Sequence, residues 1–272
     1  MSTPTPEPQR LFDLYRRLRD HFGYAPDWWP GSPFDIFVTA VLVQQCDWAT
    51  AWEALGRLHE SGLSSLDDLA AADEDTLADT IRPVAFHATK AERLRSLCRY
   101  VVRRHGSVAN LLARNRETPV VRGELLSLPG IGEETADAML SFAGQHPRFV
   151  VDAYARRAFM RIGGFGGDRD WWFRAPYHEL HDLFYDAIRA ELPRYGRCGL
   201  NSQAPGFTAA LRDVHAQLTE LGKHHCLKSA PRCRGQGVAG WKGYFHCVDH
   251  CRDGACTECP LWEVCETGRG AA

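Results

Sequence analysis

The stretch LPGIGEETA, residues 128–136, decides the fold. A helix ends at the proline–glycine turn, and a new helix starts at once. Gly130 and Gly132 carry no side chains that would keep a ligand from the backbone. Amide groups at such a helix start suit a phosphate, and contacts of this kind position a protein on DNA without reading its sequence. The stretch therefore predicts two helices joined by a tight turn that binds phosphate, although an ordinary turn between helices explains the glycines alone about as well.

Helical periodicity extends outward on both sides of this stretch. Apolar residues recur at helical spacing in residues 11–22, 34–46, 49–60 and 88–105, and two further helices are expected near 177–191 and 207–222. Ser65 and Asp73 are expected to cap two short helices. Alternation typical of strands is nearly absent, with FVVDAY at 149–154 the isolated exception, and residues 163–176 are expected to form a loop or junction. The sequence predicts an all-α protein.

The composition limits the classes of function. The chain has 272 residues, of which 44% are hydrophobic, and its net charge is −2. This is enough apolar material for one large domain or two modest ones, and nucleic-acid binding would need a local basic patch. No apolar run is long enough to span a membrane. Residues 1–9 are expected to be a disordered proline-rich tail rather than a secretory signal, so we expect a cytoplasmic protein.

Two residue types are distributed unevenly. Arginine outnumbers lysine by 28 to four, and seven of the ten cysteines lie between Cys226 and Cys265. A GC-rich genome would explain the arginines, but the scarcity of lysine also leaves few amines for Schiff-base chemistry. Cysteines crowded into one window of a chain without an export signal indicate a metal site rather than a disulfide framework.

Asp152 is an acidic residue among apolar neighbours, directly before the arginine-rich segment 153–161. One interpretation is an N-cap of the helix that follows. The other is a carboxylate in a partly dry site, where it would stabilise a positively charged sugar or activate water. Both roles can hold at once.

These segments together resemble a known family. LPGIGEETADAML at 128–140, followed by FVVDAYARR at 149–157, is similar to the helix-hairpin-helix DNA glycosylases of the endonuclease III-like branch. WWPGSPFDIFVTAVLVQQCDW at 28–48 and IRPVAFHATKAERL at 81–94 resemble two further segments of that family. The variants present here most resemble the endonuclease III-related 3-methyladenine glycosylases.

The resemblance implies two helical domains and a cluster loop. Residues 34–149 would form the helical domain that contains the hairpin. Residues 10–33 with 150–225 would form the second domain, with Asp152 in the groove between the two. Residues 226–272 would form a cysteine-rich loop that carries an iron–sulfur cluster.

The resemblance also implies a mechanism. Asp152 matches the family's catalytic carboxylate, and Glu134 stands where bifunctional members carry the lysine that forms a Schiff base. A carboxylate cannot form an imine, so strand cleavage is expected to be absent or weak, and hydrolysis would leave an abasic site. Glu134 is thus assigned to the catalytic site, with a favourable first-turn charge on its helix as the alternative.

The family match assigns further residues to DNA and to the flipped base. The expected DNA contacts are Gln44, Gly130, Gly132, Thr135 and Arg156, with Gln44 filling the stack or contacting the orphan base. Trp28, Trp29 and Trp48 are the candidates for stacking on an extruded base. Core packing is the alternative for each tryptophan, and a solvated helix position is the alternative for Arg156.

The cysteine window resembles the family's C-x6-C-x2-C-x5-C loop, interrupted by an insertion at 233–255. The assigned ligands are Cys226, Cys256, Cys259 and Cys265. Their spacing alone suits zinc as well as iron, and the resemblance favours [4Fe–4S]. Cys233, Cys247 and Cys251, beside His246 and His250, would hold an additional zinc ion, or are spare thiols. Replacement of Cys226 by Cys233 as a cluster ligand is a further alternative.

The expected function is base excision repair in the nucleoid by a monomeric DNA glycosylase that needs no membrane. Its partner would be double-stranded DNA with a damaged, alkylated base, which the enzyme flips and releases by N-glycosidic hydrolysis. One alternative is a glycosylase and AP lyase for oxidised pyrimidines. The other is a catalytically inactive protein that binds damaged DNA.

Overall fold

The computed structural model describes residues 7–24, 27–165, 168–195, 206–234 and 258–270. Within these ranges the regular structure is helical, apart from an isolated β-bridge between Arg234 and Glu258. The predicted all-α class is confirmed. None of the described helices is long and apolar enough to cross a membrane. The chain divides into unit 1, Met1–Trp28 with Arg148–Ala272, and unit 2, Trp29–Pro147.

Unit 2 is built from short helices around one long one. Its helices are α2 (Pro33–Leu42), α3 (Trp48–Glu60), α4 (Leu66–Ala71), α5 (Glu74–Thr80), α6 (His87–His105), α7 (Val108–Leu111), α8 (Thr118–Leu126), α9 (Glu133–Ala138) and the π-helix η1 (Met139–Ala143).

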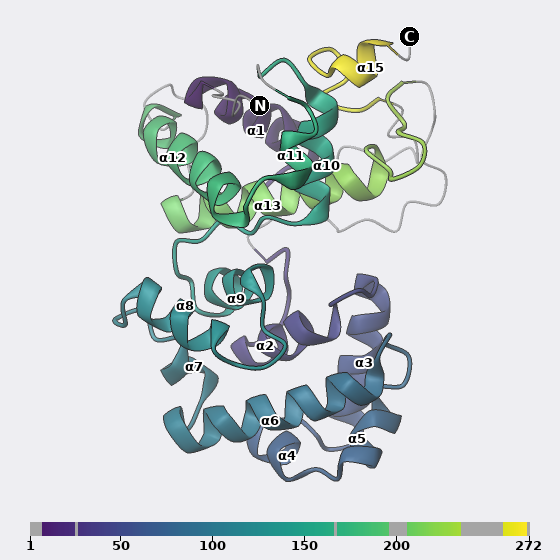
Figure 1. Ribbon diagram of the computed structural model, residues 1–272, viewed down its shortest axis with the longest axis vertical. Coiled ribbons are helices and arrows are strands. Elements are labelled where there is room, and N and C mark those ends of the chain that lie inside the picture. The colour runs from purple at the N-terminus through teal and green to yellow at the C-terminus, as the bar shows by residue number, and fades with distance from the viewer. Residues whose placement is uncertain (1–6, 25–26, 166–167, 196–205, 235–257, 271–272) are drawn as a thin grey trace. The chain divides into compact units, whose positions relative to one another are not determined.

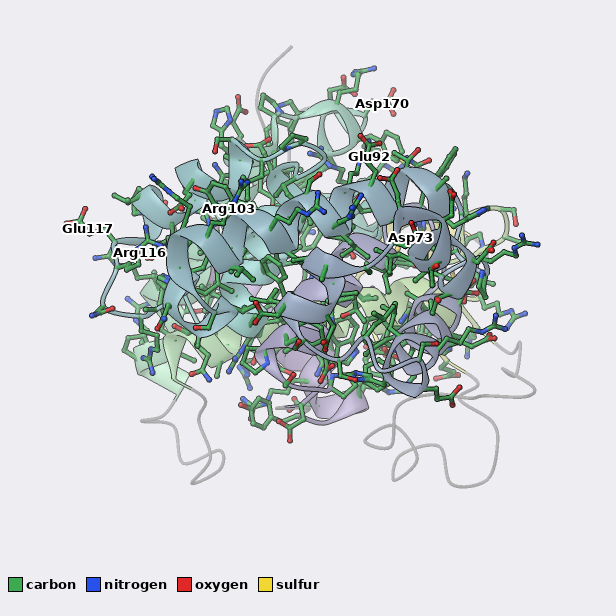
Figure 2. The ribbon with its side chains drawn as sticks, turned by 90° about the horizontal axis from the view of Figure 1, so that it is seen from below. Asp73, Glu92, Arg103, Arg116, Glu117 and Asp170 are labelled. Atoms are coloured by element: carbon green, nitrogen blue, oxygen red, sulfur yellow. The ribbon has the colours of Figure 1, made fainter. Side chains whose placement is uncertain are left out.

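The long helix α6 organises the packing of unit 2. Helices α4 and α5 lie against it, and α2 packs against η1 and α3 (Figure 1). Leu94 of α6 is fully buried in this core, whereas Glu92 and Arg103 are exposed among the charged side chains of its surface (Figure 2). The amphipathic pattern of residues 88–105 therefore predicted this helix correctly.

Side-chain caps begin the short helices of unit 2. Ser65 accepts the backbone N–H of Asp68 at 3.1 Å, and Asp73 accepts that of Thr76 at 3.0 Å. Both predicted caps are confirmed. Helix α2 departs from expectation, because it ends at Leu42 rather than near residue 46.

Unit 1 contains the helices that surround Asp152. They are α1 (Pro8–Phe22), α10 (Ala153–Ile162), α11 (Trp171–Arg174), α12 (Tyr177–Tyr195), α13 (Phe207–His224) and α15 (Glu266–Gly270). Residues 163–176, predicted to be a loop or junction, thus include the single turn of α11. FVVDAY forms no strand; its end begins α10.

The core of unit 1 joins segments far apart in the sequence. Helix α1 packs against α12 and α13, and α13 also packs against α10 (Figure 1). Leu18, Phe159 and Leu211 are among the buried residues shared by these helices. The domain ranges expected from the sequence, and a groove between them, stay predictions.

Candidate active site, hairpin and cysteine cavity

The hairpin of unit 2 joins α8 to α9. Gly130 adopts a φ of +81°, a left-handed conformation that favours glycine. Gly132 is the N-cap residue of α9 and makes no side-chain cap, and the space where a Cβ would stand is open. The backbone can therefore approach a ligand closely at this point, as the sequence motif requires.

Gln44 is tied to this hairpin. Its Nε2 donates to the carbonyl of Gly130 at 3.1 Å and to Thr135 Oγ1 at 3.0 Å. The structure thus brings together three of the predicted DNA contacts. The next residue, Gln45, is exposed and has a φ of +53°.

Lys90 fixes the loop that carries Gln44. Its ammonium donates to the carbonyls of Leu42 at 2.7 Å and Gln44 at 2.6 Å, and the residue is 2% exposed. Burial lowers the pKa of Lys90. Sequence reasoning gave Lys90 no role, although a lysine on the inner side of the amphipathic segment 88–105 was a signal for one.

The acidic residues of α9 have different environments. Glu133 pairs with Arg122 at 3.0 Å, and the same guanidinium lies 2.9 Å from the buried Asp137. Glu134 is exposed in the first turn of the helix. It therefore has the placement expected of a first-turn acid, and a catalytic role for it stays a prediction.

Two of the predicted base-stacking residues meet within unit 2. Trp29 and Trp48 form an edge-to-face pair with ring centroids 5.2 Å apart. Trp29 Nε1 donates to Thr39 Oγ1 at 2.9 Å, and Trp48 stacks on Trp52 at 5.7 Å. Both rings are half-buried, so each combines core packing with an accessible part.

Asp152 begins α10 in unit 1. Its Oδ1 accepts the backbone N–H of Ala155 at 2.7 Å, which confirms the N-cap interpretation. Its Oδ2 accepts the Thr219 hydroxyl at 3.1 Å, and His215 Nδ1 lies 4.0 Å from the same oxygen. The residue is only 8% exposed. Fixed donors thus hold a carboxylate in a mostly dry place.

Burial lowers the pKa of His215, which favours its neutral ring. A neutral ring leaves the charge of Asp152 uncompensated on that side. Sequence reasoning missed His215 and Thr219. The signal was the spacing of four positions between His215 and Thr219, because residues four apart share one face of a helix.

Trp28 belongs to the same unit and lies against α13. Its Nε1 donates to Glu220 Oε1 at 2.9 Å, and its ring meets His215 edge to face at 5.4 Å. Lys223 Nζ lies 5.5 Å from the ring centroid and interacts electrostatically with Asp152. Trp28 is thus part of the surroundings of Asp152.

Arg156 makes internal contacts in this structure. Its Nη1 donates to the carbonyls of Phe173 at 3.2 Å and Ala175 at 2.8 Å, which fixes the end of α11. A phosphate contact by Arg156 stays a prediction.

Four thiols line one cavity in unit 1. They belong to Cys226, Cys233, Cys259 and Cys265. Cys233 and Cys226 thus line the same cavity, and which of them would bind a cluster stays a prediction. Cys256, the remaining assigned ligand, lies outside the described residues, as do Cys247 and Cys251 of the predicted zinc site.

Four thiols are a donor set that both zinc and iron–sulfur clusters use. In the part of the chain that the structure describes, no three His, Cys, Asp or Glu side chains are placed to hold a metal ion. Zinc needs four ligands converging at about 2.3 Å, whereas a cubic cluster offers each thiolate its own iron. Burial raises the pKa of the Cys259 thiol to about 12 and also raises those of Cys233 and Cys265. Such thiols ionise when a cationic group binds them.

Comparisons with known proteins identify the class. The sequence profile of the HhH-GPD superfamily base excision DNA repair protein matches residues 38–170. A Methanocaldococcus jannaschii protein named as DNA repair glycosylase MJ1434 is 30% identical over 82% of this chain and 91% of its own. Bacillus subtilis endonuclease III is 28% identical over 88% of this chain and 83% of its own. The chain belongs to the HhH-GPD superfamily of base excision DNA repair proteins.

Solved structures share the fold. The Helicobacter pylori 3-methyladenine DNA glycosylase MagIII, bound to 1,N6-ethenoadenine, superposes with a TM-score of 0.67 at 24% identity, over 78% of this chain and 97% of that one. An endonuclease III trapped covalently on DNA gives a TM-score of 0.66 at 20% identity, over 98% of this chain and 99% of that one.

Replacing Lys90 by Met should destabilise unit 2 by about 2 kcal/mol, because two buried carbonyls lose a charged donor. Urea unfolding of the full chain, followed by circular dichroism, measures this change. Arg82→Met is the control, since that side chain is 70% exposed and its ion pair with Asp79 should contribute less than about 1 kcal/mol. Equal unfolding midpoints for the two variants would contradict the assigned role of Lys90.

Proposed function

We propose that this protein is a monofunctional DNA glycosylase that flips an alkylated base out of double-stranded DNA and hydrolyses its N-glycosidic bond. The observation that carries the proposal is the buried Asp152 carboxylate, held by the Ala155 amide and the Thr219 hydroxyl. Membership of a base excision repair superfamily supplies the reaction class.

Asp152 acts on the sugar. As the base leaves, positive charge develops on the deoxyribose, and a fixed carboxylate in a dry site stabilises that charge. The same carboxylate can accept a proton from the attacking water. The bond from C1′ to the base nitrogen breaks, water adds to C1′, and an abasic site remains. Thr219 and His215 are positioning residues, because they act through Asp152.

Two features support hydrolysis without strand cleavage. Glu134 occupies the hairpin position at which the resemblance places a Schiff-base lysine, and an exposed carboxylate there cannot form an imine. Lys90, the lysine near the hairpin loop, is already bound to two carbonyls. One relative, Arabidopsis thaliana ROS1, is named as a DNA glycosylase and AP lyase. It is 25% identical to this protein over 71% of this chain.

Two features support an alkylated base. Trp29 and Trp48 are half-buried and Trp28 is 7% exposed, and a positively charged alkylated purine stacks well on aromatic rings of this kind. The fold is shared with a 3-methyladenine glycosylase. Alkylation also weakens the glycosidic bond, so the modest machinery around Asp152 is sufficient.

DNA would be held through its backbone at the hairpin. The amides that follow Gly130 and Gly132 would accept a phosphate, and Gln44 would fill the space that the flipped base leaves. Gln44 is bonded to Gly130 and Thr135, which ties its side chain to the hairpin and supports a shared role on DNA.

We also propose that Cys226, Cys233, Cys259 and Cys265 hold a [4Fe–4S] cluster. The cavity that these four residues line supports this set, and their spacing keeps C-x6-C at one end of the cysteine window and C-x5-C at the other. When bound, the cluster would link the end of α13 to the C-terminal segment. Arg161 already donates to Cys226 Sγ at 3.3 Å and would balance the negative charge of a bound cluster there.

A panel of duplexes carrying alkylated, oxidised or deaminated bases tests the reaction. We expect an alkylated base to be released and the strand to break only after alkali treatment. Borohydride added during the reaction should trap no covalent adduct, because Glu134 offers no amine. A trapped adduct would overturn the monofunctional mechanism. Specific binding to damaged DNA without release of any base would favour the inactive damage-binding alternative.

Iron and sulfide analysis of the purified protein tests the cluster. We expect about four irons per chain. Cys233→Ser should lower the iron content, while Cys98→Ser, at a buried cysteine in unit 2, should leave it unchanged. Full iron in Cys233→Ser, or fewer than about three irons in the wild type, would contradict the proposed ligand set.

A further inference from the structure

Helix α13 places a second buried carboxylate beside Trp28. Glu220 is 0% exposed, and its Oε1 accepts the indole N–H of Trp28 at 2.9 Å. Its Oε2 lies 3.1 Å from His224 Nε2. The mechanism above makes no use of this group, yet a fully buried carboxylate is rare unless it is paired.

The surroundings of Glu220 favour its charged form. Burial alone would raise its pKa, but the hydrogen bond from His224, the charge of Lys223 and the hydrogen bond from Trp28 lower it overall. A negative charge therefore stands at the edge of the Trp28 ring at neutral pH. Because the group is buried, solvent and salt screen this charge only weakly.

The chain itself already places a cation in this environment. Lys223 Nζ lies 3.9 Å from Glu220 Oε1 and 5.5 Å from the centroid of the Trp28 ring, and it also interacts with Asp152. One carboxylate and one indole therefore lie close to an ammonium group, and a second carboxylate acts on it from farther away. This is the chemistry that attracts a positively charged ring, and all four residues belong to unit 1.

We propose that Glu220 determines specificity: its carboxylate makes the Trp28 face favour a cationic base over a neutral base of the same shape. The inference rests on the proposed function, which assigns Trp28 to the base pocket. An indole whose N–H donates to an anion carries more electron density on its face, which strengthens a cation–π contact. The carboxylate charge adds direct attraction at short range in a poorly solvated site. Purine nucleotides alkylated at ring nitrogen N3 or N7 are cations, whereas the undamaged bases are neutral.

Base binding without turnover tests this inference. Quenching of tryptophan fluorescence in the full chain gives dissociation constants for the 7,9-dimethylguaninium cation, kept below neutral pH, and for neutral 9-methylguanine. We expect the wild type to prefer the cation. Glu220→Gln keeps an acceptor for the indole N–H but removes the charge, so this preference should fall by about tenfold, while binding of the neutral base changes less than about twofold.

A matched control removes a different buried carboxylate from the same unit. Glu191→Gln affects a residue that is 5% exposed and pairs with Arg194 at 2.9 Å on α12. It should keep the wild-type preference. Trp28→Phe, which keeps an aromatic face but lacks the N–H, should lower the preference and serves as the second test if Glu220→Gln does not fold.

Each outcome bears on the inference. The inference would be overturned if the wild type bound the cationic and the neutral base equally well. It would also be overturned if Glu220→Gln weakened the binding of both bases equally, or if Trp28→Phe kept the wild-type preference for the cation. Failure of the proposed function looks different, because it appears as the absence of base release from every damaged duplex. A protein that releases an alkylated base but shows no dependence on Glu220 would retain its function and lose this inference.

Discussion

The burial of a carboxylate at the start of α10 is the constraint on which the site depends. Asp152 follows the apolar residues 149–151, and a buried carboxylate is stable only where donors meet it. The N–H of Ala155 and the hydroxyl of Thr219 supply two donors. The positive end of the helix dipole adds further stabilisation. The N-cap role and the proposed chemical role would thus be two consequences of one arrangement.

This arrangement requires α13 to lie close to α10. Gly222 of α13 faces the ring of Tyr154, and a Cβ at that position would collide with the ring. Arg157 of α10 donates to the carbonyls of Gly222 at 3.1 Å and Cys226 at 2.7 Å. Helices α10 and α13 therefore hold Asp152 next to its partner Thr219. The end of α13 leads into the cysteine cavity.

The segment that follows helix α13 needs an anchor in addition to hydrophobic packing. After this helix the chain carries little apolar periodicity, and four buried thiols line a cavity at the edge of the unit 1 core. Thiols with raised pKa values are poor anions by themselves. A bound cationic cluster would both ionise them and hold the tail in place.

Local signals in the sequence predicted local structure well. The hairpin at 128–136 and the caps Ser65, Asp73 and Asp152 all depend on residues within a few positions of one another, and the structure has each of them. The end of α2 was predicted wrongly, because the contact of Lys90 with the Leu42 carbonyl joins residues 48 positions apart.

Side-chain contacts between segments far apart in the chain could not be predicted from the sequence pattern. Thr219 meets Asp152 across 67 positions, and Trp28 meets Glu220 across 192. Spacing alone left Cys233 as an alternative ligand, and only the packing around the cavity places it with Cys226. Such pairs follow from tertiary packing, which no local periodicity encodes.

The central claim is that the charge of Asp152 drives base release, and Asp152→Asn tests it directly. Asparagine also caps helices well, so thermal unfolding should change little. Single-turnover release of an alkylated base from duplex DNA should fall by about a hundredfold or more, because the neutral amide cannot stabilise a cationic sugar. Release at the wild-type rate by a folded Asp152→Asn protein would contradict the account.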